Sequence, residues 1–174
     1  MGKKAMTRPA STAMKAATVD YVSGLACSQA VLAAFSERYG LGRELALRLA
    51  AAFEGGTGMQ GDVCGSLVGV YLILGLEYGG IDPNDLDAKQ MTMQKVNEAT
   101  RRFKECNGGK LTCRDLLEID ISTPEGLGQA LSENSFRRHC PRFVRSAVQI
   151  VEELLNETTA DPSAETKISE AVTE

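Results

Sequence analysis

One apolar run constrains the fold of this chain more than any other feature of the sequence. It covers residues 63–76, VCGSLVGVYLILGL, and the charged Glu77 follows it directly. A helix needs about 20 apolar residues to cross a bilayer, and this run is well short of that length. We therefore expect residues 63–76 to form a buried, glycine-containing helix at the centre of a helical bundle rather than a membrane span.

Helical spacing of apolar residues dominates the rest of the chain, and no segment alternates over five residues as a half-buried strand would. Caps and terminators divide this pattern into helices over residues 11–38, 43–53, 63–78 and 82–104, a short helix after Thr112, and a long helix from Pro141. The residues predicted to point inward are Val22, Leu25, Ala26, Leu32, Ala33, Phe35, Leu45, Leu49, Phe53, Met93, Val96, Phe103, Val144, Ala147, Val148, Val151, Leu154 and Leu155. The predicted fold is an all-α, single-domain bundle of about five to six helices.

Charge is concentrated at the two ends of the chain. Residues 1–10 are basic, residues 157–174 are acidic, and the formal net charge is −4. We expect both ends to be solvated extensions of one domain, residues 11–156. Nucleic acid is excluded as the main partner, because the sequence lacks the basic field that phosphate binding needs. No apolar segment follows the basic start as a signal peptide requires, so we expect a cytoplasmic protein.

Five cysteines stand at positions 27, 64, 106, 113 and 140. No C-x-x-C pair occurs, so the spacing fits neither a thioredoxin-type dithiol nor a zinc ribbon. Cys64, Cys113 and Cys140 are each predicted at a helix N-terminus, where the helix dipole favours the thiolate, the form that attacks disulfides and binds metals. Cys27 is predicted in the middle of the first helix, as a wall of the same site. Cys106 ends a helix, where the dipole opposes a thiolate, so we expect it to take no part.

A glycine-rich segment, residues 53–62, precedes Cys64. It matches G-x-G-x-x-G in form, but a dinucleotide site needs a strand before this motif, and here the pattern predicts a helix. Glycines allow positive φ and close backbone approach, and successive N–H groups form anion-binding nests. The segment is therefore either a plain helix–helix loop or a donor of N–H groups to a cofactor, through Gly55, Gly56, Gly58, Gly61 and Gly65.

His139 is the only histidine, so this chain alone cannot supply a catalytic triad or a multi-histidine metal site. Its position beside Cys140 fits an extra metal ligand, although an exposed histidine is the more common outcome. The arginines around it are expected to form a charged helix face; they are Arg137, Arg138, Arg142 and Arg145.

The order of these motifs resembles that of the C_GCAxxG_C_C family, whose members are described as redox-active proteins. The resemblance rests on CSQAVL at residues 27–32, on the glycines and CGS within residues 55–69, on CRDL at residues 113–116, and on Cys140. It extends over residues 21–155, with Ser66 where the family has a small alanine, and Cys106 lies outside the pattern. It implies a helical protein that uses four cysteines for redox chemistry or for an iron–sulfur cluster. Related domains accompany haem in some cytochromes, which implies electron transfer.

Our leading hypothesis is that an iron–sulfur cluster, which exchanges electrons with a redox partner protein, is held by Cys27, Cys64, Cys113 and Cys140. The first alternative is a metal-free thiol–disulfide protein, in which one of these thiols attacks and another resolves the disulfide. The second is a helical interaction module with buried structural cysteines, or with a structural zinc held by the same four residues. The sequence leaves open whether the chain forms a homo-oligomer.

Overall fold

The computed structural model describes residues 10–159, and within them the chain forms helices and no strand. The all-α prediction is confirmed, with more helices than expected. Residues 1–9 and 160–174, which hold most of the predicted basic start and acidic tail, lie outside the described residues. The helices are α1 (Thr12–Val22), α2 (Cys27–Ala33), η1 (Ser36–Tyr39), α3 (Arg43–Ala50), η2 (Ala51–Phe53), α4 (Gly65–Tyr78), α5 (Leu86–Cys106), α6 (Cys113–Leu117), α7 (Pro124–Ser132) and α8 (Ser135–Thr159).

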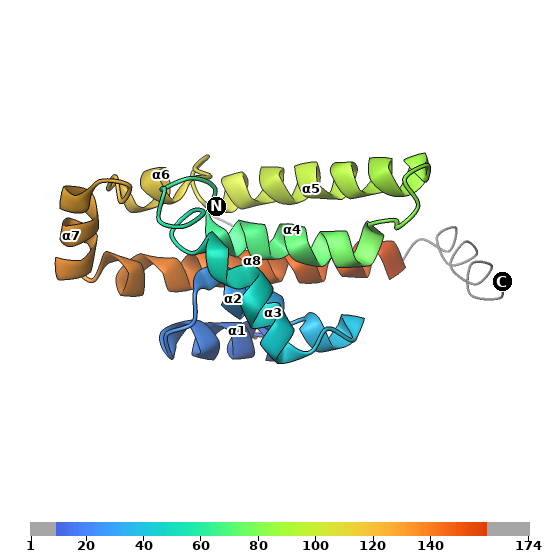
Figure 1. The fold of residues 1–174 in the computed structure, drawn as a ribbon, viewed down its shortest axis with the longest axis horizontal. Coiled ribbons are helices and arrows are strands. Elements are labelled where there is room, and N and C mark those ends of the chain that lie inside the picture. Colours follow the sequence, from blue (N-terminus) through green and yellow to red (C-terminus); the bar gives the residue numbers. More distant parts are fainter. Residues whose placement is uncertain (1–9, 160–174) are drawn as a thin grey trace, which may run out of the picture.

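Helix α4, which the apolar run forms, lies at the centre of the bundle as predicted. Figure 1 shows α4 between α5 and α8 along the length of the molecule, with α1, α2 and α3 on one side and α6 and α7 at one end. Gly69 allows α2 to approach closely, because a Cβ at this position would lie 2.8 Å from Cβ of Val31. Among residues 10–159, no helix combines the length and the apolarity that crossing a bilayer would require.

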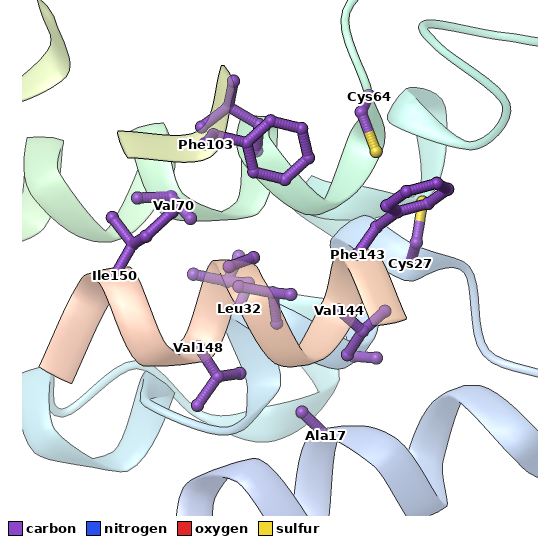
Figure 2. Packing of buried hydrophobic residues seen from close by; sticks show 14 of the residues in the cluster. Ala17, Cys27, Leu32, Cys64, Val70, Phe103, Phe143, Val144, Val148 and Ile150 are labelled. Atoms are coloured by element: carbon purple, nitrogen blue, oxygen red, sulfur yellow. The ribbon is translucent and has the colours of Figure 1, made fainter. Parts of the chain in front are cut away.

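Helix α8 supplies the longest apolar stripe of the core. Its predicted inward residues, from Val144 to Leu155, are all buried, and Figure 2 shows Val144 and Val148 packed toward Leu32 and Ala17. The predicted start at Pro141 is wrong, because α8 begins at Ser135, directly after Asn134 with its left-handed φ of 55°. Pro141 lies inside the helix, where its missing N–H removes the bond that the carbonyl of Arg137 would accept.

The predicted first helix over residues 11–38 is interrupted, which changes the position of Cys27. Helix α1 ends at Val22, Gly24 has a φ of +111°, and α2 begins at Cys27. The N–H of Ala26 is satisfied by Oε1 of Gln29 at 2.9 Å. Because only glycine adopts such a φ readily, Gly24 ends the helix at this point. Cys27 is therefore the first residue of a helix rather than a mid-helix residue.

Three predicted inward faces are wrong in detail. Val22, the last residue of α1, is 60% exposed. In α3 the side chains of Leu45 and Leu49 are each 52% exposed, whereas Ala46 and Ala50 are fully buried. The small alanines let α3 pack closely on α2, so the leucines turn to solvent. In α5, Met93 is 57% exposed, because this helix reaches the core through Ala99 and Phe103, nearer its end.

Helices α5, α6 and α7 each begin directly after a residue whose side chain caps the N-terminus. Thr112 accepts a hydrogen bond from the N–H of Asp115 at 3.1 Å, which confirms the predicted start of α6. Helix α5 begins after Asp85, not at residue 82, because the carboxylate of Asp85 accepts from the N–H of Ala88. Helix α7 was not predicted, although Thr123 followed by Pro124 is a typical start.

Candidate functional site

Cys64 and Cys113 are brought together by the backbone. Val63 and Thr112 form an isolated antiparallel bridge. The N–H of Cys64 donates to the carbonyl of Leu111 at 3.0 Å, and the N–H of Cys113 donates to the carbonyl of Asp62 at 2.7 Å. Cys64 is the N-cap of α4 and Cys113 is the first residue of α6. Both positions at helix starts are confirmed, and the bridge that joins them is a long-range feature.

Cys27 reaches the same place from the start of α2. A Cβ on Gly65 would lie only 2.7 Å from Sγ of Cys27 and 2.4 Å from the carbonyl oxygen of Phe53. Only glycine leaves room for this sulfur against the first turn of α4. Figure 2 shows the sulfurs of Cys27 and Cys64 turned toward one another beside the ring of Phe143. Gly65, predicted as a cofactor-binding residue, thus lies directly against one of the predicted ligands.

Cys140 approaches from α8 together with Tyr21 of α1. The hydroxyl of Tyr21 donates to the carbonyl of Phe136 at 3.1 Å and also faces the thiol of Cys140. The predicted N-cap position of Cys140 is wrong, since α8 starts five residues earlier, at Ser135. The two predicted positions are therefore reversed. Cys27 is at a helix start, and Cys140 is in a helix interior. Three of the four cysteines still stand at helix N-termini.

The thiols form a connected buried cluster. Hydrogen bonding to Cys64 is the main cause that raises the pKa of Cys27, followed by burial, and hydrogen bonding to Cys113 is the main cause that raises the pKa of Cys64. Burial raises the pKa of Cys140 to about 12, and the nearby sulfur of Cys27 adds to this effect. The exposed fractions are 6% for Cys27, 2% for Cys64, 5% for Cys113 and 8% for Cys140. The four sequence-predicted ligands are therefore all buried, and the raised pKa values of Cys27, Cys64 and Cys140 favour the neutral form of these three thiols.

The glycine segment has an unusual left-handed course. Residues 55–59 all have φ between 60° and 73°, including the non-glycine residues Thr57 and Met59. The N–H groups of residues 59–62 are satisfied within the segment, by carbonyls of residues 54–57. A Cβ on Gly56 would lie 2.5 Å from the carbonyl oxygen of Asp62, so the turn needs glycine there. The tight turn places residues 61–64 beside residues 111–114, where α6 begins.

The other predicted glycines differ in their surroundings. Gly55, Gly56 and Gly61 are buried, and Gly58 is exposed at the outside of the turn. Arg114 fixes the segment, because its guanidinium donates to the carbonyl of Gln60 at 3.2 Å and to Asp120 at 3.0 Å. The binding of a cofactor by these glycines stays a prediction, and the N–H of Gly61 is already bonded to the carbonyl of Gly55.

Cys106 and His139 lie outside this cluster. Cys106 is largely exposed at the end of α5, and its pKa is raised by partial desolvation and by the nearby carboxylates of Glu153 and Glu105. His139 is half-buried and lies near Glu118, which follows α6. Neither residue is therefore needed to describe the four-cysteine site.

Sequence reasoning missed two hydroxyl groups at the site, those of Tyr21 and Ser66. Tyr21 borders Cys140, and it also lines a surface cavity of about 220 Å³ together with Leu25, Glu54, Arg137 and Pro141. Ser66 is completely buried in the first turn of α4. No motif marks Tyr21, but Ser66 was visible as a departure from the alanine of the resembling family.

Comparison with known proteins identifies a family. No curated protein and no solved structure matches the chain. Residues 25–154, about three quarters of the chain, match the model of the C_GCAxxG_C_C family, which is described as "Putative redox-active protein". The matched segment contains all four of the gathered cysteines. The chain belongs to the C_GCAxxG_C_C family.

Proposed function

We propose that this protein is an electron-transfer protein whose four buried cysteines hold an iron–sulfur cluster. The observation that carries the proposal is the connected set of thiols, in which Cys64 contacts both Cys27 and Cys113. Cys140 completes the set beside Cys27. Four cysteine thiolates are the usual ligands of [2Fe–2S] and [4Fe–4S] clusters.

The electrostatic surroundings support an occupant that carries both iron and thiolate. Burial and mutual contact raise the pKa values of three of these thiols. The four-cysteine site therefore disfavours a thiolate that has no metal to balance its charge. Iron replaces the thiol protons and compensates the negative charge of the sulfurs. The N-termini of α2, α4 and α6 lie at the four-cysteine site. Their helix dipoles would favour the net negative charge of a cluster with its thiolates.

The described residues hold no preformed site for a single metal ion. Among residues 10–159, no three His, Cys, Asp or Glu side chains are arranged to hold one metal ion. The zinc alternative therefore has no geometric support in the described part of the chain.

The rest of the chain keeps the site dry and fixed. When bound, the cluster would accept and release one electron at a time. Phe143 and Leu116 are buried in the same core and exclude water from the thiols. Such burial prevents a direct reaction of the sulfurs with large substrates, and it favours electron exchange with a partner protein at the surface.

Anaerobic purification tests the proposal. We expect the reconstituted protein to contain iron and acid-labile sulfide and to absorb visible light, which bleaches on reduction. Cys64→Ser should lose the colour, whereas the matched control Cys106→Ser should keep it. Wild-type protein that stays colourless and free of iron after anaerobic reconstitution would overturn the proposal.

A metal-free dithiol is the second candidate, and the contacts of Cys64 favour it. Cys64 has a thiol neighbour on each side, so it could close a disulfide with Cys27 or with Cys113. In that reaction two thiols release two protons and pass two electrons to an oxidant such as a partner disulfide. Thiol counting in metal-free protein before and after mild oxidation tests it. A reversible loss of two thiols supports this candidate, and an unchanged thiol count contradicts it.

An interaction module, alone or as a homo-oligomer, is the remaining alternative. It predicts that replacing all four buried cysteines by alanine lowers stability only, with no loss of a metal or of a redox reaction. Size-exclusion chromatography with light scattering of wild type and variant would report the oligomeric state in the same experiment.

A further inference from the structure

Ser66 carries a buried hydroxyl group that the fold does not use. Its side chain is 0% exposed, and its Oγ has no partner with hydrogen-bond geometry. Among the described residues, no other buried side-chain nitrogen or oxygen lacks a partner. A buried polar group without a partner destabilises a fold, so a serine at this position needs another explanation.

Two other buried serines show what a structural hydroxyl does in this protein. Oγ of Ser28 donates to the carbonyl of Ala50 at 2.8 Å, and Oγ of Ser36 donates to the carbonyl of Ala33 at 3.2 Å. A helical serine can donate to the carbonyl four residues earlier. For Ser66 this carbonyl belongs to Asp62, which already accepts the N–H of Cys113.

The surroundings of Ser66 point to the sulfur of Cys27 as its acceptor. Gly65, the preceding residue, lies so close that a Cβ there would be 2.7 Å from this sulfur. The hydroxyl of Ser66 is itself close enough to the sulfur of Cys27 to interact with it. A hydroxyl bonds weakly to a neutral thiol and much more strongly to a charged sulfur. A metal-bound sulfur at Cys27 would supply the charged acceptor that the hydroxyl of Ser66 lacks.

We propose that Ser66 is a positioning residue that donates a hydrogen bond to the metal-bound sulfur of Cys27 and raises the reduction potential of the site. This inference rests on the proposed function. Reduction adds negative charge to a cluster and its thiolates, and a donor to a ligand sulfur stabilises the reduced form more than the oxidised form. The hydroxyl would thus lower the stability of the metal-free protein and donate a hydrogen bond once the metal is bound.

The test compares Ser66→Ala with Ser28→Ala in the full chain. Both variants remove one buried hydroxyl, and the two residues flank the same sulfur, but only Ser28 has a structural partner. We expect reconstituted Ser66→Ala to have a more negative midpoint potential than wild type in an anaerobic redox titration. Metal-free Ser66→Ala should unfold at the same or a higher urea concentration than wild type. Ser28→Ala should show the opposite pattern, with a lower urea midpoint and an unchanged potential.

The outcomes separate this inference from the proposed function. Equal potentials for wild type and Ser66→Ala, both with a cluster, would overturn the inference alone. A urea midpoint of metal-free Ser66→Ala lowered as far as that of Ser28→Ala would also overturn it, because the hydroxyl would then have a structural role. Wild-type protein that takes up no iron and sulfide would overturn the proposed function and the inference together.

Discussion

Val63 and Thr112 pair as one antiparallel bridge, and this pairing sets Cys64 and Cys113 side by side. The bridge is flanked by the two hydrogen bonds of the cysteine N–H groups, at 3.0 Å and 2.7 Å. Half of the site is therefore fixed by the backbone and does not depend on side-chain packing. The other half depends on how closely α2 and α8 approach, and therefore on particular small residues.

Gly65→Ala should disrupt the site. Its Cβ would lie 2.7 Å from Sγ of Cys27 and 2.4 Å from the carbonyl oxygen of Phe53, and neither atom is the end of a long flexible side chain. We expect a loss of about 1–3 kcal/mol in the free energy of unfolding, together with weaker binding of the cluster. Urea unfolding of the metal-free protein and iron content after reconstitution measure the two effects.

Gly75→Ala in the same helix is the matched control. A Cβ at position 75 meets nothing within 4 Å, and alanine is favoured over glycine in a helix interior by about 0.5–1 kcal/mol. This variant should gain stability and keep its iron. Equal losses of stability at positions 65 and 75 would contradict the close contact with Cys27.

Thr57→Gly should stabilise the glycine segment. Thr57 is a β-branched residue with a φ of 60°, and a left-handed conformation costs such a residue about 1–2 kcal/mol. We expect the free energy of unfolding to rise by about 1 kcal/mol in urea. The control Gln94→Gly, on the exposed side of α5, should lose about 1 kcal/mol. If Thr57→Gly also lowered the free energy of unfolding, the turn would not be strained at Thr57.

Stability of the metal-free protein should fall in alkaline solution through Cys140. Burial raises its pKa from 9.0 to about 12, so the unfolded chain ionises at lower pH than the folded one. The contribution of the neutral Cys140 thiol to the free energy of unfolding is fully present below about pH 9. Between about pH 9 and pH 12 it is lost, by up to about 1.4 kcal/mol per pH unit. The difference in unfolding free energy between wild type and Cys140→Ala should shrink accordingly from pH 8 to pH 10. A difference that does not change with pH would contradict the assigned burial.

Tyr21→Phe should affect both stability and Cys140. It removes the hydrogen bond to the carbonyl of Phe136, at a cost of about 1 kcal/mol. It also removes a donor that favours the thiolate of Cys140, so the pKa of this thiol should rise further.

The pH dependence of Cys140 alkylation, followed by mass spectrometry in metal-free protein, measures the effect on the thiol. Tyr71→Phe is the control, because it removes a comparable hydrogen bond, to Thr100 at 2.7 Å, on another part of the surface of α4 and α5. Identical alkylation profiles for both variants would show that Tyr21 does not act on Cys140.

The sequence was most informative where local chemistry decides the structure. Thr112 caps α6 through the N–H of Asp115, so the position of Cys113 could be predicted from residues three apart. The apolar run predicted α4 and the place of Cys64, because glycines and the preceding turn limit where that helix begins.

The errors arose where the backbone leaves the usual helical range or where distant elements meet. Gly24 and Asn134 take positive φ values, and these two turns move Cys27 to a helix start and Cys140 into a helix interior. Leu45 and Leu49 follow a helical period, but the close approach of α2 selects the alanines for the core. The contact between Cys64 and Cys113 depends on a bridge between residues that are far apart in the chain. Such a contact has no local sequence signal.

Quantifying iron and sulfide in wild-type and Cys64→Ser protein, purified and reconstituted without oxygen, tests the central claim most directly. The account predicts similar molar amounts of iron and sulfide in the wild type, with a visible chromophore that bleaches on reduction, and neither element in the variant. Iron-free wild-type protein, or equal iron in the two proteins, would contradict it.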